Sequence, residues 1–64
     1  MLHLPTQILT LVEEGYDCVL TAGALNPMPD QEGNFLAKDL CLDLHFAIDI
    51  LAKVRDAIKE EVNP

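Results

Sequence analysis

Residues 40–58, LCLDLHFAIDILAKVRDAI, decide the fold that this sequence predicts. Apolar residues recur here at alternating intervals of four and three positions, which is the spacing of a helix that packs along another helix. These residues form the predicted oligomer seam: Leu40, Leu44, Ala47, Leu51, Val54 and Ile58. Phe46, Ile48 and Ile50 widen the apolar surface beyond a narrow seam. We therefore expect a helix over about residues 34–61, with Asn34 as its N-cap because an Asn side chain can accept a bond from a first-turn amide.

The N-terminal half predicts a shorter helix over about residues 5–22. Pro5 suits a first helical turn, where its missing N–H removes no hydrogen bond, and Gly23 can adopt the left-handed conformation that ends many helices. One helical face would carry Ile8, Leu11, Val12, Gly15, Val19 and Ala22, with Leu9 and Leu20 beside it.

An alternative ends this helix at Glu14 and makes residues 16–21, YDCVLT, a strand. A single strand in so short a chain would have unpaired edges and would need a second subunit to pair with. We favour the helix, and the sequence leaves the choice for residues 16–21 open.

The connection over residues 23–33 is longer than the two to eight residues that usually join neighbouring helices. Pro27 and Pro29 stiffen it, because proline fixes its own φ and pushes the preceding residue toward extended geometry. We expect this loop to fold back so that Leu25 and Met28 close the open end of a helical bundle. The alternative is a preformed recognition loop, in which Met28 is an adaptable apolar contact between acidic neighbours.

These elements predict an all-α fold, a helical hairpin of two antiparallel helices that forms a single domain over residues 1–64. Half of the residues are apolar, whereas a chain of this size buries only about 60% of the surface that its unfolded form exposes. The predicted second helix would also extend beyond the first. We therefore expect a homo-oligomer, most simply a two-fold dimer that forms a four-helix bundle.

The charge distribution indicates the kind of partner. The net charge is −7, and residues 1–37 contain five acidic residues and no Lys or Arg. Phosphate backbones would be repelled, so direct binding to nucleic acid is not expected, whereas a basic protein surface would be attracted. The candidate partner-binding residues are Glu13, Glu14, Asp17, Met28, Asp30 and Glu32. We expect a non-catalytic interaction or regulatory protein; the alternative is an acidic inhibitor that occupies the basic groove of a nucleic-acid-handling protein.

Few residues could carry chemistry. The chain has no serine, and Cys41 lies four residues before His45 but among leucines, where a buried thiol is typically inert. His45 and Asp49 have the spacing of two metal ligands, yet two ligands make a poor site, so we interpret them as a solvated face. We expect no cofactor and no metal, and an enzyme is the least favoured class.

Compartment and membrane contact are the remaining expectations from the sequence. Cys18 and Cys41 are interpreted as reduced, buried thiols, because the N-terminal residues lack the pattern of a secretory signal. The most apolar run, residues 40–51, contains two aspartates and a histidine, so no membrane span is expected. These features together predict a cytoplasmic protein.

Overall fold

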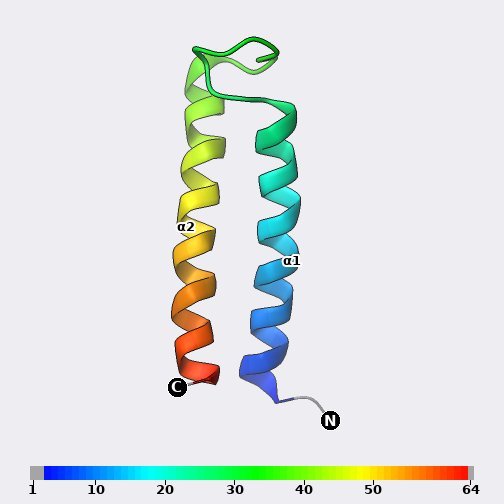
Figure 1. Ribbon diagram of the computed structural model, residues 1–64, viewed down its shortest axis with the longest axis vertical. Helices are drawn as coiled ribbons and strands as arrows, with labels where there is room; N and C mark the ends of the chain where they lie inside the picture. Colours follow the sequence, from blue (N-terminus) through cyan, green and yellow to red (C-terminus); the bar gives the residue numbers. More distant parts are fainter. Residues whose placement is uncertain (1–2, 64) are drawn as a thin grey trace.

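The computed structural model describes residues 3–63; Met1, Leu2 and Pro64 lie outside the described part. Two helices, α1 (Leu4–Leu25) and α2 (Lys38–Val62), pack side by side and antiparallel, and residues 26–37 connect them (Figure 1). The predicted all-α helical hairpin is confirmed. Residues 16–21 lie inside α1, so the strand alternative is wrong.

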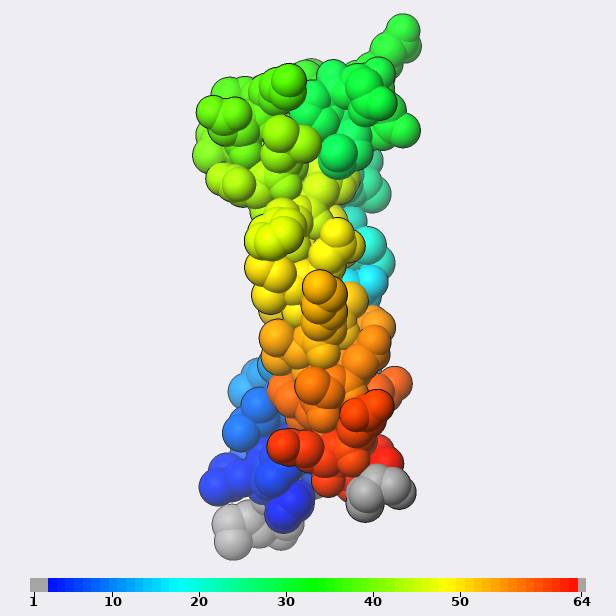
Figure 2. All heavy atoms as spheres, turned by 90° about the vertical axis from the view of Figure 1, so that its left-hand side faces the viewer, coloured from blue at the N-terminus to red at the C-terminus, as the bar shows by residue number. Residues whose placement is uncertain are grey.

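The molecule is a short rod of 44 × 19 × 14 Å, with the loop forming a broader head at one end (Figure 2). The helices have 22 and 25 residues. At 1.5 Å per residue this difference is only about 5 Å, so the large overhang of the second helix that we expected is absent.

Both ends next to the loop differ from the sequence prediction. α1 continues past Gly23 to Leu25, because Gly23 serves as a packing contact and not as a terminator. α2 begins at Lys38, with Ala37 in the N-cap position and no side-chain cap bond. Asn34 is therefore not the cap, since its side chain bonds to the loop and to Cys41 instead.

One stripe of α1 faces α2, and we call it the inner seam of α1. Leu9 and Gly23 are buried in it, and the other members are half-buried. Its residues again follow alternating intervals of four and three: Pro5, Leu9, Val12, Tyr16, Val19 and Gly23. The face that the sequence predicted is divided, because Val12 and Val19 point inward whereas Ile8 and Leu11 are exposed.

The inner seam of α2 lies one position after the predicted oligomer seam. Cys41 is fully buried in it, and its next members are half-buried: His45, Ile48, Ala52 and Arg55. Within the predicted oligomer seam, Leu44, Ala47, Leu51 and Ile58 are half-buried, whereas Leu40 and Val54 are exposed. The predicted seam is thus the outer neighbour of the stripe that packs on α1.

The core of the single hairpin is thin. Over residues 3–63 the buried apolar side chains are Leu9 and Cys41, whereas thirteen large apolar side chains are exposed. Two helices offer each other only one face, so the remaining apolar surface faces solvent in one copy of the chain.

Candidate functional site

Asn26 organises the loop end of the hairpin, where the candidate site lies. Its backbone N–H donates to the Ala22 carbonyl and closes the last turn of α1. Its side-chain Oδ1 accepts two backbone N–H groups, from Phe35 at 2.6 Å and from Leu36 at 3.1 Å. The residue is only 6% exposed, so these bonds replace water at a buried carbonyl oxygen and hold the two ends of the loop together.

Cys41 and His45 fasten the loop from the side of α2. The Cys41 thiol donates to the Pro27 carbonyl at 3.0 Å and accepts from Asn34 Nδ2 at 3.4 Å. His45 Nε2 lies 2.9 Å from the Asn26 carbonyl oxygen. Because a carbonyl can only accept, Nε2 carries the hydrogen in this contact.

This arrangement changes the interpretation of His45. The sequence placed it on a solvated face with Asp49, but the ring is half-buried and packs against Gly23 of α1. A ring beside a glycine can approach the opposite backbone, which explains why a polar residue stands in an inner seam. Over residues 3–63, no three potential metal-binding side chains come together.

Cys41 and His45 each donate a hydrogen to a backbone carbonyl of the loop. A nucleophile and its base would instead need to bond to each other. The geometry therefore describes two anchors for residues 26–27. Cys18, which we expected to be buried, is exposed on α1, and both thiols are free.

The loop does not close the end of the hairpin in the way the sequence suggested. Leu25 is 73% exposed, and Met28 is 36% exposed. A backbone bond from Gln31 N–H to the Met28 carbonyl turns the loop, and Gly33 has φ +91°, a conformation that glycine adopts without strain. Met28 is therefore positioned by a folded loop and remains accessible.

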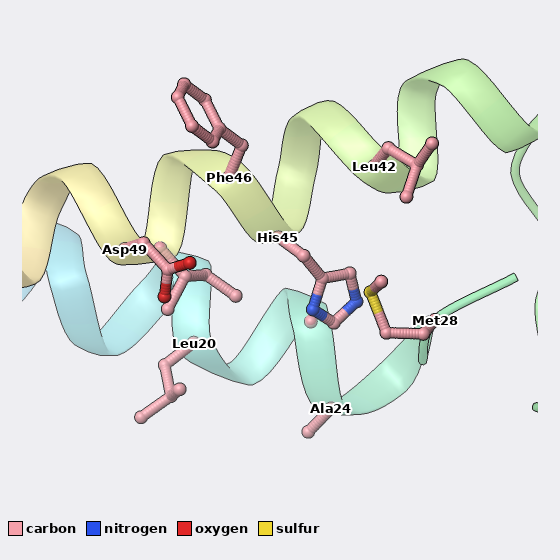
Figure 3. Close-up of a pocket in the computed structure, with 9 residues that line it drawn as sticks. Leu20, Ala24, Met28, Leu42, His45, Phe46 and Asp49 are labelled. Atoms are coloured by element: carbon pink, nitrogen blue, oxygen red, sulfur yellow. The ribbon is translucent and has the colours of Figure 1, made fainter.

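Met28 lines an open depression of about 610 Å³ between the two helices at the loop end (Figure 3). The depression is lined by Leu20, Gly23 and Ala24 of α1 and by five residues of α2: Leu42, His45, Phe46, Ile48 and Asp49. Its lining is mostly apolar, and Asp49 supplies a carboxylate at the same place. This combination suits an apolar side chain that ends in, or lies beside, a positive charge.

Two acidic residues of α1, Glu13 and Asp17, extend the same side of the hairpin, and Glu14 lies next to them on the surface of α1 that faces away from α2. Asp17 lies three residues before Leu20 and so falls within one turn of the depression, and Glu13 lies one turn further along α1. Glu14 and Asp17 are exposed, Glu13 is half-buried, and Asp30 and Glu32 are exposed on the loop. In the described part of the chain the only ion pair joins Arg55 and Asp56 at 3.1 Å, so these five carboxylates have no basic partner there.

The sequence indicated Met28 and the acidic residues. It did not indicate the role of Asn26, the contact of His45 with the loop, or the depression. The signal for Asn26 was the Asn-Pro pair at residues 26–27, a combination that favours turns. No sequence signal indicates which backbone groups the Asn side chain bonds, because Phe35 and Leu36 come close only after the loop has folded.

Neither helix of residues 3–63 combines the length and the apolar character that crossing a membrane requires. Comparison of the chain with protein-family models, with curated proteins and with solved structures gave no match. A function for this chain must therefore be inferred from the geometry of its loop end and of its two helical faces.

Proposed function

We propose that this protein is a small non-catalytic interaction protein, self-associated as a dimer, that binds a basic segment of another protein. The observation that carries the proposal is the apolar depression at the loop end, bordered by Asp49 and continued along α1 by unpaired carboxylates. We call this surface, formed by the depression together with Glu13, Glu14 and Asp17, the acidic face.

Chemical complementarity defines the partner. A Lys or Arg side chain has an apolar stem that fits an apolar depression and a charged head that would meet Asp49. Further basic residues, one helical turn apart, would meet Glu14 and Asp17. An amphipathic helix with Lys or Arg beside Leu fits this description, since its apolar anchors fill a groove while its charges select the surface.

A synthetic amphipathic Leu/Lys helix is the probe that tests the acidic face. Its affinity is measured by fluorescence anisotropy for the wild type, for Glu14→Lys/Asp17→Lys, and for a matched control, Glu60→Lys/Glu61→Lys. Each double substitution changes the net charge from −7 by +4 to −3, so a difference between them reports position and not total charge. We expect the first variant to bind about tenfold or more weaker than the control.

Two further measurements complete the test. Ala24→Phe should weaken the binding of the Leu/Lys helix, because Ala24 is an exposed part of the lining and a Phe there would fill the depression without changing the net charge. Affinity should also fall as salt rises from about 50 to about 300 mM. Equal losses in both charge variants, or full affinity in Ala24→Phe, would contradict the proposed surface. Displacement of a natural partner by duplex DNA would instead favour the inhibitor of a nucleic-acid-handling protein.

A further inference from the structure

A second apolar stripe runs along α1 beside its inner seam. It contains Leu4, Ile8, Leu11, Gly15, Cys18, Ala22 and Leu25, at unbroken alternating intervals of four and three. We call it the outer seam of α1. No member is charged, and its large side chains face solvent, with Leu4 68% and Leu11 66% exposed. A repeat of this kind is the pattern of a helix that packs along another helix.

The two helices therefore each carry two adjacent seams, displaced by one residue. In α1 the inner seam contacts α2 and the outer seam is open. In α2 the predicted oligomer seam lies in the corresponding place, where Leu40 and Val54 are exposed and the other four members are half-buried. A helix in a hairpin has one neighbour and needs one seam. A helix in a four-helix bundle has two neighbours and needs two.

Both outer seams lie on the same broad side of the hairpin. At 100° per residue, Leu20 and Ala24 of the depression flank the inner seam of α1 on one side, and Ile8 and Leu11 flank it on the other. In antiparallel α2, Asp49 lies on the side of the depression and Val54 on the opposite side. One broad side thus carries the depression, and the other carries the two outer seams.

The hairpin exposes more surface than a compact chain of its mass. A compact globular chain of 7.1 kDa has about 4,100 Å² of accessible surface, whereas this hairpin has 4896 Å². The excess of about 800 Å² over a compact chain is comparable to the area that each partner buries in a standard protein interface.

The order of side-chain sizes along the outer seam of α1 identifies the occupant. When a copy is turned by 180° about Gly15, Ile8 comes level with Ala22 of the copy and Leu11 comes within about 1.5 Å of the level of Cys18. These two large side chains each meet a small one, whereas Leu4 and Leu25 meet each other at the ends of the seam. Gly15 then meets itself, and nothing lies within 4 Å of the place where its Cβ would stand. The outer seam of α1 itself contains no charged residue, so two chains of net charge −7 can approach along it without placing a carboxylate in the contact.

We propose that the outer seam of α1 packs antiparallel on the outer seam of a second copy, with the two-fold axis at Gly15. This inference specifies the dimer included in the proposed function and is independent of the acidic face, which stays exposed on both outer sides. If cross-linking contradicts the proposed register, the binding of the Leu/Lys helix to one chain is not affected. If the Leu/Lys helix does not bind, the proposed dimer is not affected.

Disulfide cross-linking under mild oxidation tests the register. In the proposed dimer the two Cys18 residues are displaced by about 9 Å along the helix axis, beyond the ~7 Å over which a disulfide can form without backbone movement. Wild type should therefore cross-link slowly. Gly15→Cys/Cys18→Ser places both thiols on the axis, and Leu11→Cys places a thiol opposite the native Cys18 of the copy; each should cross-link at least ~10-fold faster than wild type.

Two controls make this result decisive. In Leu11→Cys/Cys18→Ser the two thiols are about 12 Å apart along the helix axis, so this variant should cross-link slowly. Thr21 lies off the seam, so Thr21→Cys/Cys18→Ser should also cross-link slowly. Fast cross-linking of wild type together with Leu11→Cys/Cys18→Ser would show a parallel dimer and overturn the proposal. Slow cross-linking of Gly15→Cys/Cys18→Ser would overturn the axis at Gly15.

Sedimentation supplies a readout without new thiols. Gly15→Leu is tolerated by one hairpin, because the space above Gly15 is open, but it blocks the close approach at the axis. We expect wild type to be dimeric at about 100 μM and Gly15→Leu to be monomeric, with Thr10→Leu, an exposed position off the seam, still dimeric. A dimeric Gly15→Leu would overturn the proposal, whether or not its helicity by circular dichroism changes.

Discussion

Gly23 of α1 and Ile48 of α2 pack directly against each other at the loop end of the hairpin. A Cβ at Gly23 would stand 2.5 Å from Ile48 Cδ1 and 3.3 Å from His45 Cε1. The absence of a side chain at this one position lets the loop ends of the helices come together. That approach brings His45 within reach of Asn26 and forms one wall of the depression.

Replacing Gly23 should therefore separate the helices at the loop end. We expect Gly23→Val to lower the free energy of unfolding by about 1–3 kcal/mol, because the extra atoms overfill a packed contact. Ala24→Val is the matched control, since it introduces the same side chain one position later on an exposed surface. Urea unfolding followed by circular dichroism compares the two, and equal midpoints would show that the Gly23–Ile48 contact does not limit packing.

The Asn26 side chain should be the largest single polar contribution of the loop. Asn26→Ala removes an acceptor of two backbone N–H groups. Because the Leu36 N–H keeps its bond to Asn34 Oδ1, the expected loss of unfolding free energy is about 1–2 kcal/mol at about 1 kcal/mol for each bond. Asn26→Asp keeps an oxygen at the same place and should lose less at neutral pH. Amide hydrogen exchange at Phe35 supplies the local readout, because its N–H bonds to Asn26 Oδ1 at 2.6 Å: unchanged protection of Phe35 in Asn26→Ala would refute the assignment.

The two thiols should react at very different rates. Cys18 is exposed and Cys41 is fully buried with its hydrogen donated to Pro27, so a thiol reagent should modify Cys18 first and Cys41 only when the loop end opens. In dilute protein Cys18 should react freely. Its rate should fall as concentration rises through the dimer range, because Cys18 belongs to the outer seam of α1. A concentration-independent rate at Cys18 would argue that this seam remains uncovered.

Arg55 and Tyr16 join the two helices near their middle. The guanidinium carbon lies 4.6 Å from the centre of the Tyr16 ring, and a hydrogen bond to the Asp56 carboxylate raises the pKa of Arg55, so the cation persists wherever the protein folds. We expect Arg55→Met to lower the urea unfolding midpoint, because it keeps the stem and removes the cation–π contact. A double-mutant cycle with Tyr16→Leu isolates the pair. A coupling energy of zero would mean that Arg55 contributes only its stem.

The two helices and their antiparallel packing could be predicted from the sequence, because apolar spacing over about twenty residues specifies a helix whatever it packs against. The ends of the helices next to the loop could not be predicted. Gly23 and Asn34 are ordinary end signals, yet Gly23 is used for contact with Ile48 and Asn34 for bonds to Leu36 and Cys41. These uses depend on residues far along the chain, so local preference could not reveal them.

The sequence by itself determined that both helices carry apolar residues at intervals of four and three. It did not reveal the inner seam of α2, because that seam contains His45 and Arg55. Only the tertiary structure decided which seam is used within the chain. Leu9 and Leu11 are chemically alike, and the difference between a buried and an exposed leucine arises because Gly23 allows the close approach that turns one stripe of α1 toward α2. The other stripe is left facing outward, and the acidic face is formed on the opposite side as a consequence.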